Sequence, residues 1–194
     1  MTLLTTLTDV KTYTGATDPS GDAAITALIS NASAFIERFC NRTFGLASYT
    51  EVRNGNNRPR MMLNNSPITA VSSLSIDGYS IQVSSGPTVG GYTFDNHSIY
   101  LRPGYINGSG FRGYGEFTRG IQNVVIAYTA GFATVPSDVA QACIELIAFK
   151  MAKRNRIDKK NETLGAQQTI GFDTSDMPAS VKTALVPYQR FTVY

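Results

Sequence analysis

The sequence reads Val125-Ile126-Ala127-Tyr128-Thr129-Ala130-Gly131-Phe132-Ala133-Thr134-Val135-Pro136-Ser137-Asp138-Val139 where two residue patterns meet. Up to Tyr128 the stretch is rich in the β-branched and aromatic residues that are typical of strands. From Pro136 onward it carries residues that begin helices, followed by apolar residues at helical spacing. The stretch therefore predicts that a strand ends near Tyr128 and that a long helix begins after Pro136.

Helical patterns occupy both ends of the chain. We expect helices over residues 8–14, 22–41, 138–156 and 178–186. Gly15 suits the left-handed end of the first helix, and the Asp22 carboxylate is expected to cap the free amides of the second. In residues 22–41 the apolar side chains recur at steps of three and four, which predicts a helix with one wide buried face.

The middle of the chain is a β-rich section over residues 47–130. Its Thr, Val, Tyr and Ile runs are interrupted by turn-forming pairs such as Asp77-Gly78, and they predict strands at 49–53, 60–63, 68–76, 92–94, 98–101 and 123–128. The predicted fold class is therefore α+β. It is a small helical bundle, of two main helices plus short terminal ones, with an inserted antiparallel β-rich section and a long loop of glycines and aromatic residues. We expect a core over residues 1–160 and a C-terminal docking tail over residues 161–194.

Composition excludes several classes of protein. The chain has 194 residues, a formal net charge of +3 and 42% apolar residues, which is enough to form a core without a metal or a disulfide. Cys40 and Cys143 lack CxxC spacing and are expected to be buried free thiols. No apolar stretch approaches the roughly 20 residues that cross a membrane, and the first residues lack a signal-peptide pattern. We therefore expect a protein made in a reducing cytoplasm, with no membrane partner.

The sequence holds no recognisable catalytic pattern. The single histidine, His97, lies in a predicted turn, and one histidine excludes multi-histidine metal sites. The glutamates stand far apart, without the pairing that carboxylate catalysis needs, and Glu116 is the one acid that merits an enzyme assay. Phosphate-binding loops of the GxxxxGK[ST] type are missing. We therefore expect no enzyme activity, no metal and no cofactor.

Positive charge is concentrated at the end of the last long helix. Three interpretations are open for this cluster: compensation of the helix dipole, attraction to nucleic-acid phosphates, or contact with an acidic patch on a partner protein. The cluster consists of Lys150, Lys153, Arg154, Arg156, Lys159 and Lys160.

Residues 102–120 combine six glycines with aromatic and basic side chains, which predicts a long exposed loop. Such a loop could stack on single-stranded bases, contact duplex phosphates or pack into a neighbouring protein, and protein contact is the favoured interpretation. Its candidate contact residues are Arg102, Tyr105, Phe111, Arg112, Tyr114, Phe117 and Arg119.

Two further groups of apolar residues are expected to need a cover. The helix over 138–156 is apolar around most of its circumference, so Ile144, Ile147 and Met151 are predicted to contact a neighbouring subunit. The C-terminal tail is predicted to dock on a partner, and we expect that residues 172–194 can be removed without unfolding the rest. The predicted docking residues are Phe172, Leu185, Tyr188, Phe191 and Tyr194.

In the order of its elements the chain resembles the head-tail connector, or adaptor, family of tailed bacteriophages. The most specific motif is Tyr128-Thr129-Ala130-Gly131-Phe132 followed by Pro136 and Asp138, and Ser66-Pro67-Ile68 with Val71 supports it. The resemblance covers residues 3–156 in outline. The chain departs from the compact helical members in its β-rich insert and its loop at 102–120.

The resemblance implies a structural virion protein at the capsid–tail junction. It implies a ring, commonly of about twelve copies, which binds the portal protein, extends the DNA channel and offers its lower face to a downstream tail protein. Double-stranded DNA would pass without sequence recognition, so contacts with it are expected to be weak. Members of this family have no catalytic residues to carry over.

Two alternatives of other classes stay open. A nucleic-acid-binding module would use the loop at 102–119 and the basic helix end at 150–160, and would bind DNA with steep salt dependence. A polysaccharide hydrolase would lose turnover on the substitution Glu116→Gln.

Overall fold

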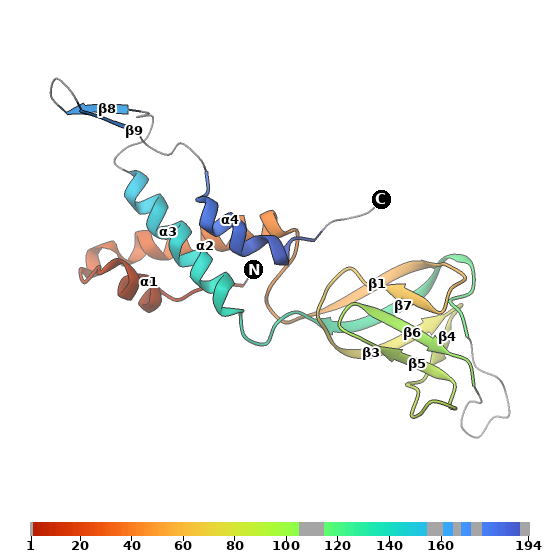
Figure 1. The fold of residues 1–194 in the computed structure, drawn as a ribbon. Coiled ribbons are helices and arrows are strands. Elements are labelled where there is room, and N and C mark those ends of the chain that lie inside the picture. Colours follow the sequence, from red (N-terminus) through yellow and green to blue (C-terminus); the bar gives the residue numbers. More distant parts are fainter. Residues whose placement is uncertain (1, 105–114, 155–160, 165–167, 172–175, 191–194) are drawn as a thin grey trace. The chain divides into compact units, whose positions relative to one another are not determined.

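The computed structural model describes residues 2–104, 115–154, 161–164, 168–171 and 176–190 (Figure 1). It divides the chain into two compact units, which we call the helical unit (residues 1–44 and 134–194) and the β unit (residues 45–133). This division differs from the predicted core at 1–160 and tail at 161–194, because the inserted β-rich section forms a unit of its own.

The helical unit contains four α-helices, as far as the described residues show. These are α1 (Leu7–Thr14), α2 (Asp22–Cys40), α3 (Ser137–Lys153) and α4 (Ala179–Leu185). Two short 3₁₀ helices, η1 (Pro19–Gly21) and η3 (Val186–Tyr188), accompany them, and a hairpin of β8 (Asn161–Leu164) and β9 (Gln168–Gly171) follows α3. The helices agree with the predicted ranges to within a few residues. The hairpin was not predicted, because residues 155–168 read as a polar linker.

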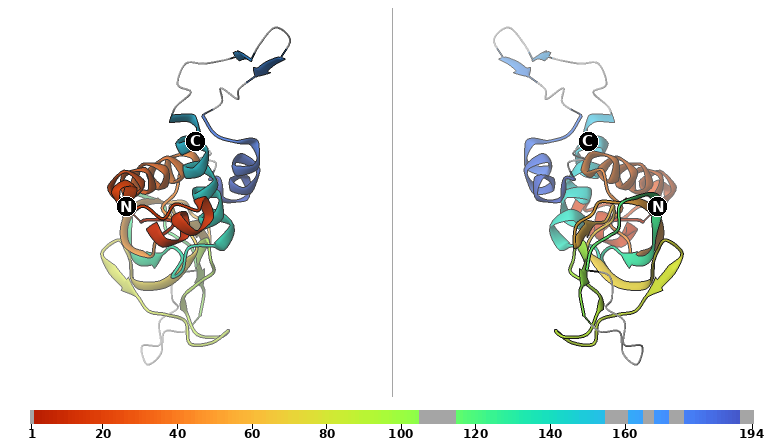
Figure 2. Two further views of the ribbon diagram at one scale, coloured as in Figure 1. Left: turned by 90° about the vertical axis from the view of Figure 1, so that its left-hand side faces the viewer. Right: turned by 90° about the vertical axis from the view of Figure 1, so that its right-hand side faces the viewer.

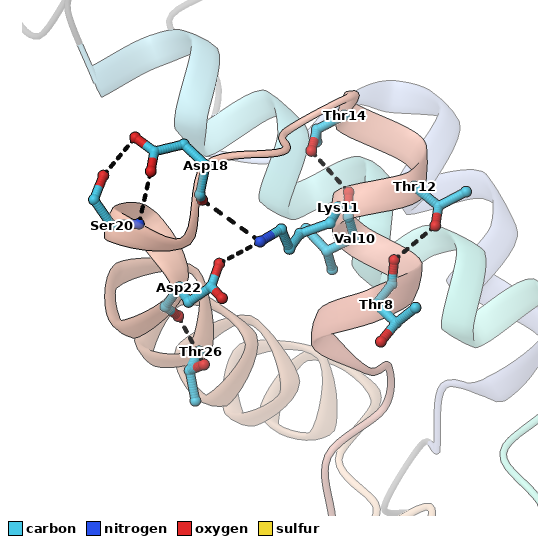
Figure 3. A network of polar contacts seen from close by, with 9 residues as sticks. All are labelled: Thr8, Val10, Lys11, Thr12, Thr14, Asp18, Ser20, Asp22 and Thr26. Atoms are coloured by element: carbon cyan, nitrogen blue, oxygen red, sulfur yellow. Dashed lines mark hydrogen bonds and ion pairs between the residues drawn. The ribbon is translucent and has the colours of Figure 1, made fainter.

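Side-chain hydrogen bonds fix the corner between α1 and α2 (Figure 3). The Thr6 hydroxyl caps α1 by accepting from the Asp9 amide at 3.2 Å, and Gly15, at φ 71°, ends the helix. The Asp18 carboxylate accepts from the Ser20 amide at 2.9 Å. Asp22 does not cap α2 as predicted. Its carboxylate instead lies 2.7 Å from the Lys11 ammonium, which joins the two helices by an ion pair.

The core of the helical unit forms around α3, which packs against α1, α2 and α4. Figure 2 shows α4 lying along α3. Helix α3 is therefore covered by helices of its own chain on several sides, which explains why its sequence is apolar around most of its circumference. The fully buried side chains of this core include Val10, Ile36, Leu146, Ile147, Val181 and Leu185. Within the part of the chain that the structure describes, no helix is both long and apolar enough to span a bilayer.

The β unit consists of two antiparallel sheets. The first has the strand order β1 (Ala47–Gly55), β7 (Gly120–Ala130), β3 (Ile68–Ile76) and β4 (Tyr79–Ile81). The second has the order β2 (Arg60–Met62), β6 (Ser98–Arg102) and β5 (Gly91–Phe94). The six predicted strands are confirmed, and β4, which was not predicted, pairs with the end of β3.

Figure 1 shows the strands of both sheets of the β unit, and the side chains of the two sheets enclose one apolar core. Alternate residues of the central strand β7, such as Val124, Ile126 and Tyr128, point into it and are at most 1% exposed. The second sheet contributes Ile99 and Leu101. The predicted tight turn at Asp77-Gly78 joins β3 to β4, and both of its residues have the positive φ that such hairpins need.

Gly131, which directly follows β7, occupies a position that requires glycine. Its φ is 119°, and a Cβ atom at this position would lie 2.3 Å from the carbonyl oxygen of Gly45. The Gly131 amide also donates to the Pro67 carbonyl at 2.9 Å. A residue other than glycine would be strained and would push the adjoining backbone away. Gly131 thus permits the close contact at the end of β7.

Candidate interaction sites

His97 and Glu116, the residues considered for catalysis in the sequence, both lie at the surface. Within the described residues, no group of three or more His, Cys, Asp and Glu is placed to hold a metal. His97 is exposed between β5 and β6, and its backbone amide donates to the Asp95 carboxylate at 2.7 Å. This turn confirms the predicted position of His97. Glu116 is exposed beside the buried Phe117.

Both cysteines are buried free thiols, as predicted. Burial raises the pKa of Cys40 to about 11, and burial likewise raises the pKa of Cys143 to about 11. The Cys143 sulfur lies 3.9 Å from the Ser33 hydroxyl, on the neighbouring helix. Since the thiolate is the reactive form, both groups are structural rather than nucleophilic.

A buried polar cluster in the β unit was missed from the sequence. Tyr128 donates its hydroxyl proton to Glu51, and the same carboxylate oxygen accepts from the Asn64 amide at 2.9 Å. The Asn65 amide donates to the Tyr128 oxygen at 3.1 Å. Burial, followed by the bond to Glu51, raises the pKa of Tyr128 to about 12. This cluster fastens the segment before β3 to the centre of the first sheet.

The sequence did contain a signal for this cluster. Tyr49, Glu51 and Arg53 alternate along β1 and therefore share one face of the strand. Glu51 is only 9% exposed, and the Arg53 guanidinium lies 3.5 Å from its second oxygen. An acid flanked by an aromatic and a basic residue at strand spacing indicates a buried, paired carboxylate.

The predicted subunit contacts on α3 need correction. Ile147 is completely buried and Ile144 is 8% exposed, both within the chain's own helical core. Neither offers a surface to a second copy, because α1, α2 and α4 already cover this helix. Met151, one turn beyond Ile147, is half-buried and remains available for contact.

The predicted docking residues of the tail divide into three groups. Leu185 is completely buried in the helical core, so its predicted role in docking is corrected. The Tyr188 hydroxyl contacts both carboxylate oxygens of Asp138, at 2.9 and 2.8 Å, and its ring lies 5.8 Å from that of Phe44. Burial, and then the bond to Asp138, raises the pKa of Tyr188. The remaining docking candidates, Phe172, Phe191 and Tyr194, lie outside the described residues.

The basic end of α3 is partly engaged within the chain. The Lys150 ammonium lies 5.1 Å from the centre of the Phe35 ring, and Lys153 lies 5.6 Å from that of Phe149. Both lysines are in the last turn of α3, where they also oppose the helix dipole. Arg154 is exposed. Arg156, Lys159 and Lys160 lie outside the described residues.

The glycine-rich loop is described only at its two ends. Arg102 and Arg119 are exposed, as predicted. Phe117 is 0% exposed in the core of the β unit, so its predicted role as a contact residue is corrected. The exposed Arg58 lies beside these ends in the structure, although it is distant from them in the sequence. The other four contact candidates, Tyr105, Phe111, Arg112 and Tyr114, lie outside the described residues.

Comparison with known proteins gives a family and a fold. A family model described as "Head completion protein" matches residues 3–191. Among solved structures, a chain of "Neck of empty GTA particle computed with C6 symmetry" shares 17% identity and a TM-score of 0.53, covering 97% of this chain and 90% of that chain. A chain of "Virion of native gene transfer agent (GTA) particle" shares 17% identity and a TM-score of 0.49, with coverages of 89% and 80%. No curated protein matches.

Proposed function

The chain belongs to the head completion protein family, and from this premise we propose that it forms a ring that joins the capsid portal to the tail. The coarser role, a structural component of the head–tail junction, follows from the family itself. The ring, its portal contact and the continuation of a DNA channel through it are our proposal. The family match over residues 3–191 is the main support for this proposal, because that range includes both units.

The overall fold supports this role. The likeness to a chain from a neck particle extends over 97% of the present chain, at a TM-score of 0.53. The β-rich insert, which distinguishes the chain from compact helical connectors, is therefore included in the likeness. We propose no chemical reaction: the protein acts by binding other virion proteins and by letting DNA pass.

Contacts between neighbouring copies are proposed on the exposed side of α2 and α3. Phe35, Phe149 and Met151 are half-buried there, and the lysines at 150 and 153 lie over the two rings. A second copy could bury the remaining apolar surface of these residues while the lysine stems stay in contact with the rings. In a ring this contact is heterologous, so each copy also uses a second, different surface.

The portal contact is proposed for the end of the tail. A backbone hydrogen bond from Arg190 to Cys40 anchors the chain to the helical unit. Phe191 and Tyr194 follow this anchored segment in the sequence. Anchoring reduces the ordering cost when a following segment docks. Phe172 remains a third candidate. DNA in the channel is proposed to make only weak contacts that do not depend on sequence.

Electron microscopy of the purified chain, alone and mixed with purified portal protein of the same phage, tests this function. We expect rings that attach coaxially to the portal. The substitution Met151→Asp should reduce ring formation at least about tenfold, because it places a charge in an apolar contact. The matched control, Ala152→Asp, adds the same charge at the exposed neighbouring position. A chain that stays monomeric and free in the presence of portal would overturn the proposal.

A further inference from the structure

Three segments that are distant in the sequence meet at one end of the β unit. The Asn57 amide donates to the Phe117 carbonyl at 2.8 Å, and the Phe117 amide donates to the Arg58 carbonyl at 3.0 Å. The Leu101 amide donates to the Pro59 carbonyl at 2.8 Å. This end, where β1 and β6 finish and β7 begins, therefore brings the backbones of residues 57–59, 101–102 and 117–119 together.

Each of these segments carries one exposed arginine: Arg58, Arg102 or Arg119. Their guanidinium groups have no hydrogen-bond or ion-pair partner within residues 2–104 and 115–154. Two other arginines of the unit behave differently. Arg53 donates to Asn64 at 2.9 Å and lies near Glu51, while Arg60 donates to Ser98 at 3.0 Å. The exposed three thus stand apart as unpaired cations, and we call them the arginine end.

Nearby acids offset part of the charge of the arginine end. Asp77 lies close to it, where its two carboxylate oxygens accept from the Thr118 hydroxyl at 2.7 Å and the Asn123 amide group at 3.0 Å. These two bonds lower the pKa of Asp77 and hold its carboxylate in place. Glu116 supplies one exposed negative charge. Against these two carboxylates the three arginines leave an excess of positive charge among the described residues, which favours an anionic partner.

Exposed apolar side chains accompany the arginines. Ile121 is 87% exposed and Tyr79 is 67% exposed. Ile121 follows Arg119 by two residues, and Tyr79 lies in the hairpin that Asp77 joins to Thr118. An exposed isoleucine does not contribute to phosphate contacts. Aromatic, aliphatic and arginine side chains together are instead typical of protein interfaces.

The use of arginine rather than lysine in the β unit gives a second, independent indication of a protein partner. Residues 45–133 contain six arginines and no lysine, while all six lysines of the chain lie in the other unit. Nonspecific contact with DNA uses both residue types, since it depends mainly on charge. Protein interfaces enrich arginine and deplete lysine, because the planar guanidinium binds a carboxylate through two parallel hydrogen bonds.

We infer that the arginine end, with Ile121 and Tyr79, is a docking surface for a protein that presents carboxylates around an apolar contact. This inference rests on the proposed function, in which the downstream tail component is the partner that remains to be bound. The arginines supply charge-assisted hydrogen bonds, and Ile121 and Tyr79 supply apolar area that becomes buried on docking.

The test compares two doubly substituted chains of equal charge. R58A/R119A removes two cations from the arginine end, and R38A/K182A removes two exposed cations from the helical unit. Heads that carry each full-length variant are mixed with purified tails of the same phage, and joined particles are counted by electron microscopy. We expect R58A/R119A to reduce joining about tenfold, with R38A/K182A and wild type equal, and with all three chains present on heads.

Separate measurements distinguish a tail protein from two other occupants of this surface, DNA and a second copy of the chain. Binding of each purified chain to a random-sequence duplex of about 30 base pairs should change less than twofold, and the oligomeric state by light scattering should not change. A parallel tenfold loss of duplex binding would assign the surface to DNA, and a loss of rings would assign it to a second copy. Either result, or undiminished joining, overturns the inference. If the wild-type chain is missing from heads, it is the proposed function that fails.

Discussion

The backbone amide of Arg190 donates a hydrogen bond to the carbonyl oxygen of Cys40 at 2.9 Å. Cys40 is the last residue of α2, whose final carbonyls have no partner within the helix. The C-terminal segment therefore completes the end of α2, and it does so after α4 has already placed Val181 and Leu185 in the core. Most of the predicted docking tail is thus part of the helical unit.

This arrangement predicts different outcomes for two truncations. Removal of residues 191–194 keeps α4 and the bond from Arg190 to Cys40, so it should lower the thermal midpoint of unfolding less than the longer truncation does, while abolishing portal binding. Removal of residues 172–194 should destabilise the helical unit by several kcal/mol, because loss of one buried leucine alone costs about 2–5 kcal/mol. Circular dichroism during heating measures the midpoint of both truncated chains. An unaltered midpoint in the longer truncation would show that α4 is dispensable for the fold.

The substitution Gly131→Ala should destabilise the β unit by about 1–3 kcal/mol, through its positive φ and the contact with the Gly45 carbonyl. Gly86→Ala is the matched control, because a Cβ atom there would meet no atom within 4 Å. Urea unfolding followed by tyrosine fluorescence compares the two. Equal midpoints for both variants would contradict the close approach at the end of β7.

The cluster around Glu51 should behave as one coupled unit. Glu51→Ala removes the acceptor of the buried Tyr128 hydroxyl, at a cost of about 1–3 kcal/mol. In a double-mutant cycle with Tyr128→Phe, the two losses should be less than additive by at least about 0.5 kcal/mol. Glu116→Ala, at an exposed acid, should have almost no effect. Strict additivity would mean that the two side chains do not interact.

Stability should fall in alkaline solution. The folded-state pKa is raised from 9 to about 11 for Cys40 and Cys143, and from 10 to about 12 for Tyr128. Between the unfolded and folded values the unfolded chain releases these protons while the folded chain keeps them, so rising pH favours unfolding. The free energy of unfolding should decline from about pH 9 upward.

The variant Tyr128→Phe separates the contributions to this decline. It removes the tyrosine proton but keeps both thiols, so its decline above pH 10 should be shallower than that of the wild type. Urea unfolding at half-unit steps from pH 8 to 11.5 measures the slopes. A wild-type stability that is flat across this range would show that none of the three groups is protected by burial.

The local elements were readable from the sequence because their patterns depend on neighbouring residues. Alternating apolar residues and turn pairs locate the strands at 60–63 and 68–76, and the Asp77-Gly78 pair locates the hairpin turn. The apolar stripe of residues 22–41 likewise locates α2. The family resemblance, based on the stretch that ends in Val139, was confirmed by the match over residues 3–191.

What the sequence concealed depends on contacts between distant segments. Ile147 and Leu185 were expected at interfaces, because the number of helices that pack on α3 is not visible from its own pattern. Phe117 was expected in an exposed loop, but its backbone pairs with residues 57 and 58, and its ring enters the core. Arg58 joined the arginine end through the same pairing.

The position of this chain in an assembled particle tests the proposed function most directly. Cryo-electron microscopy of the neck of the particle to which the chain belongs measures that position. We expect a ring of copies on the portal, with the helical unit and the β unit both recognisable in each copy and an open channel along the axis. A neck whose ring density fits other proteins only, with this chain absent, would contradict the proposed function.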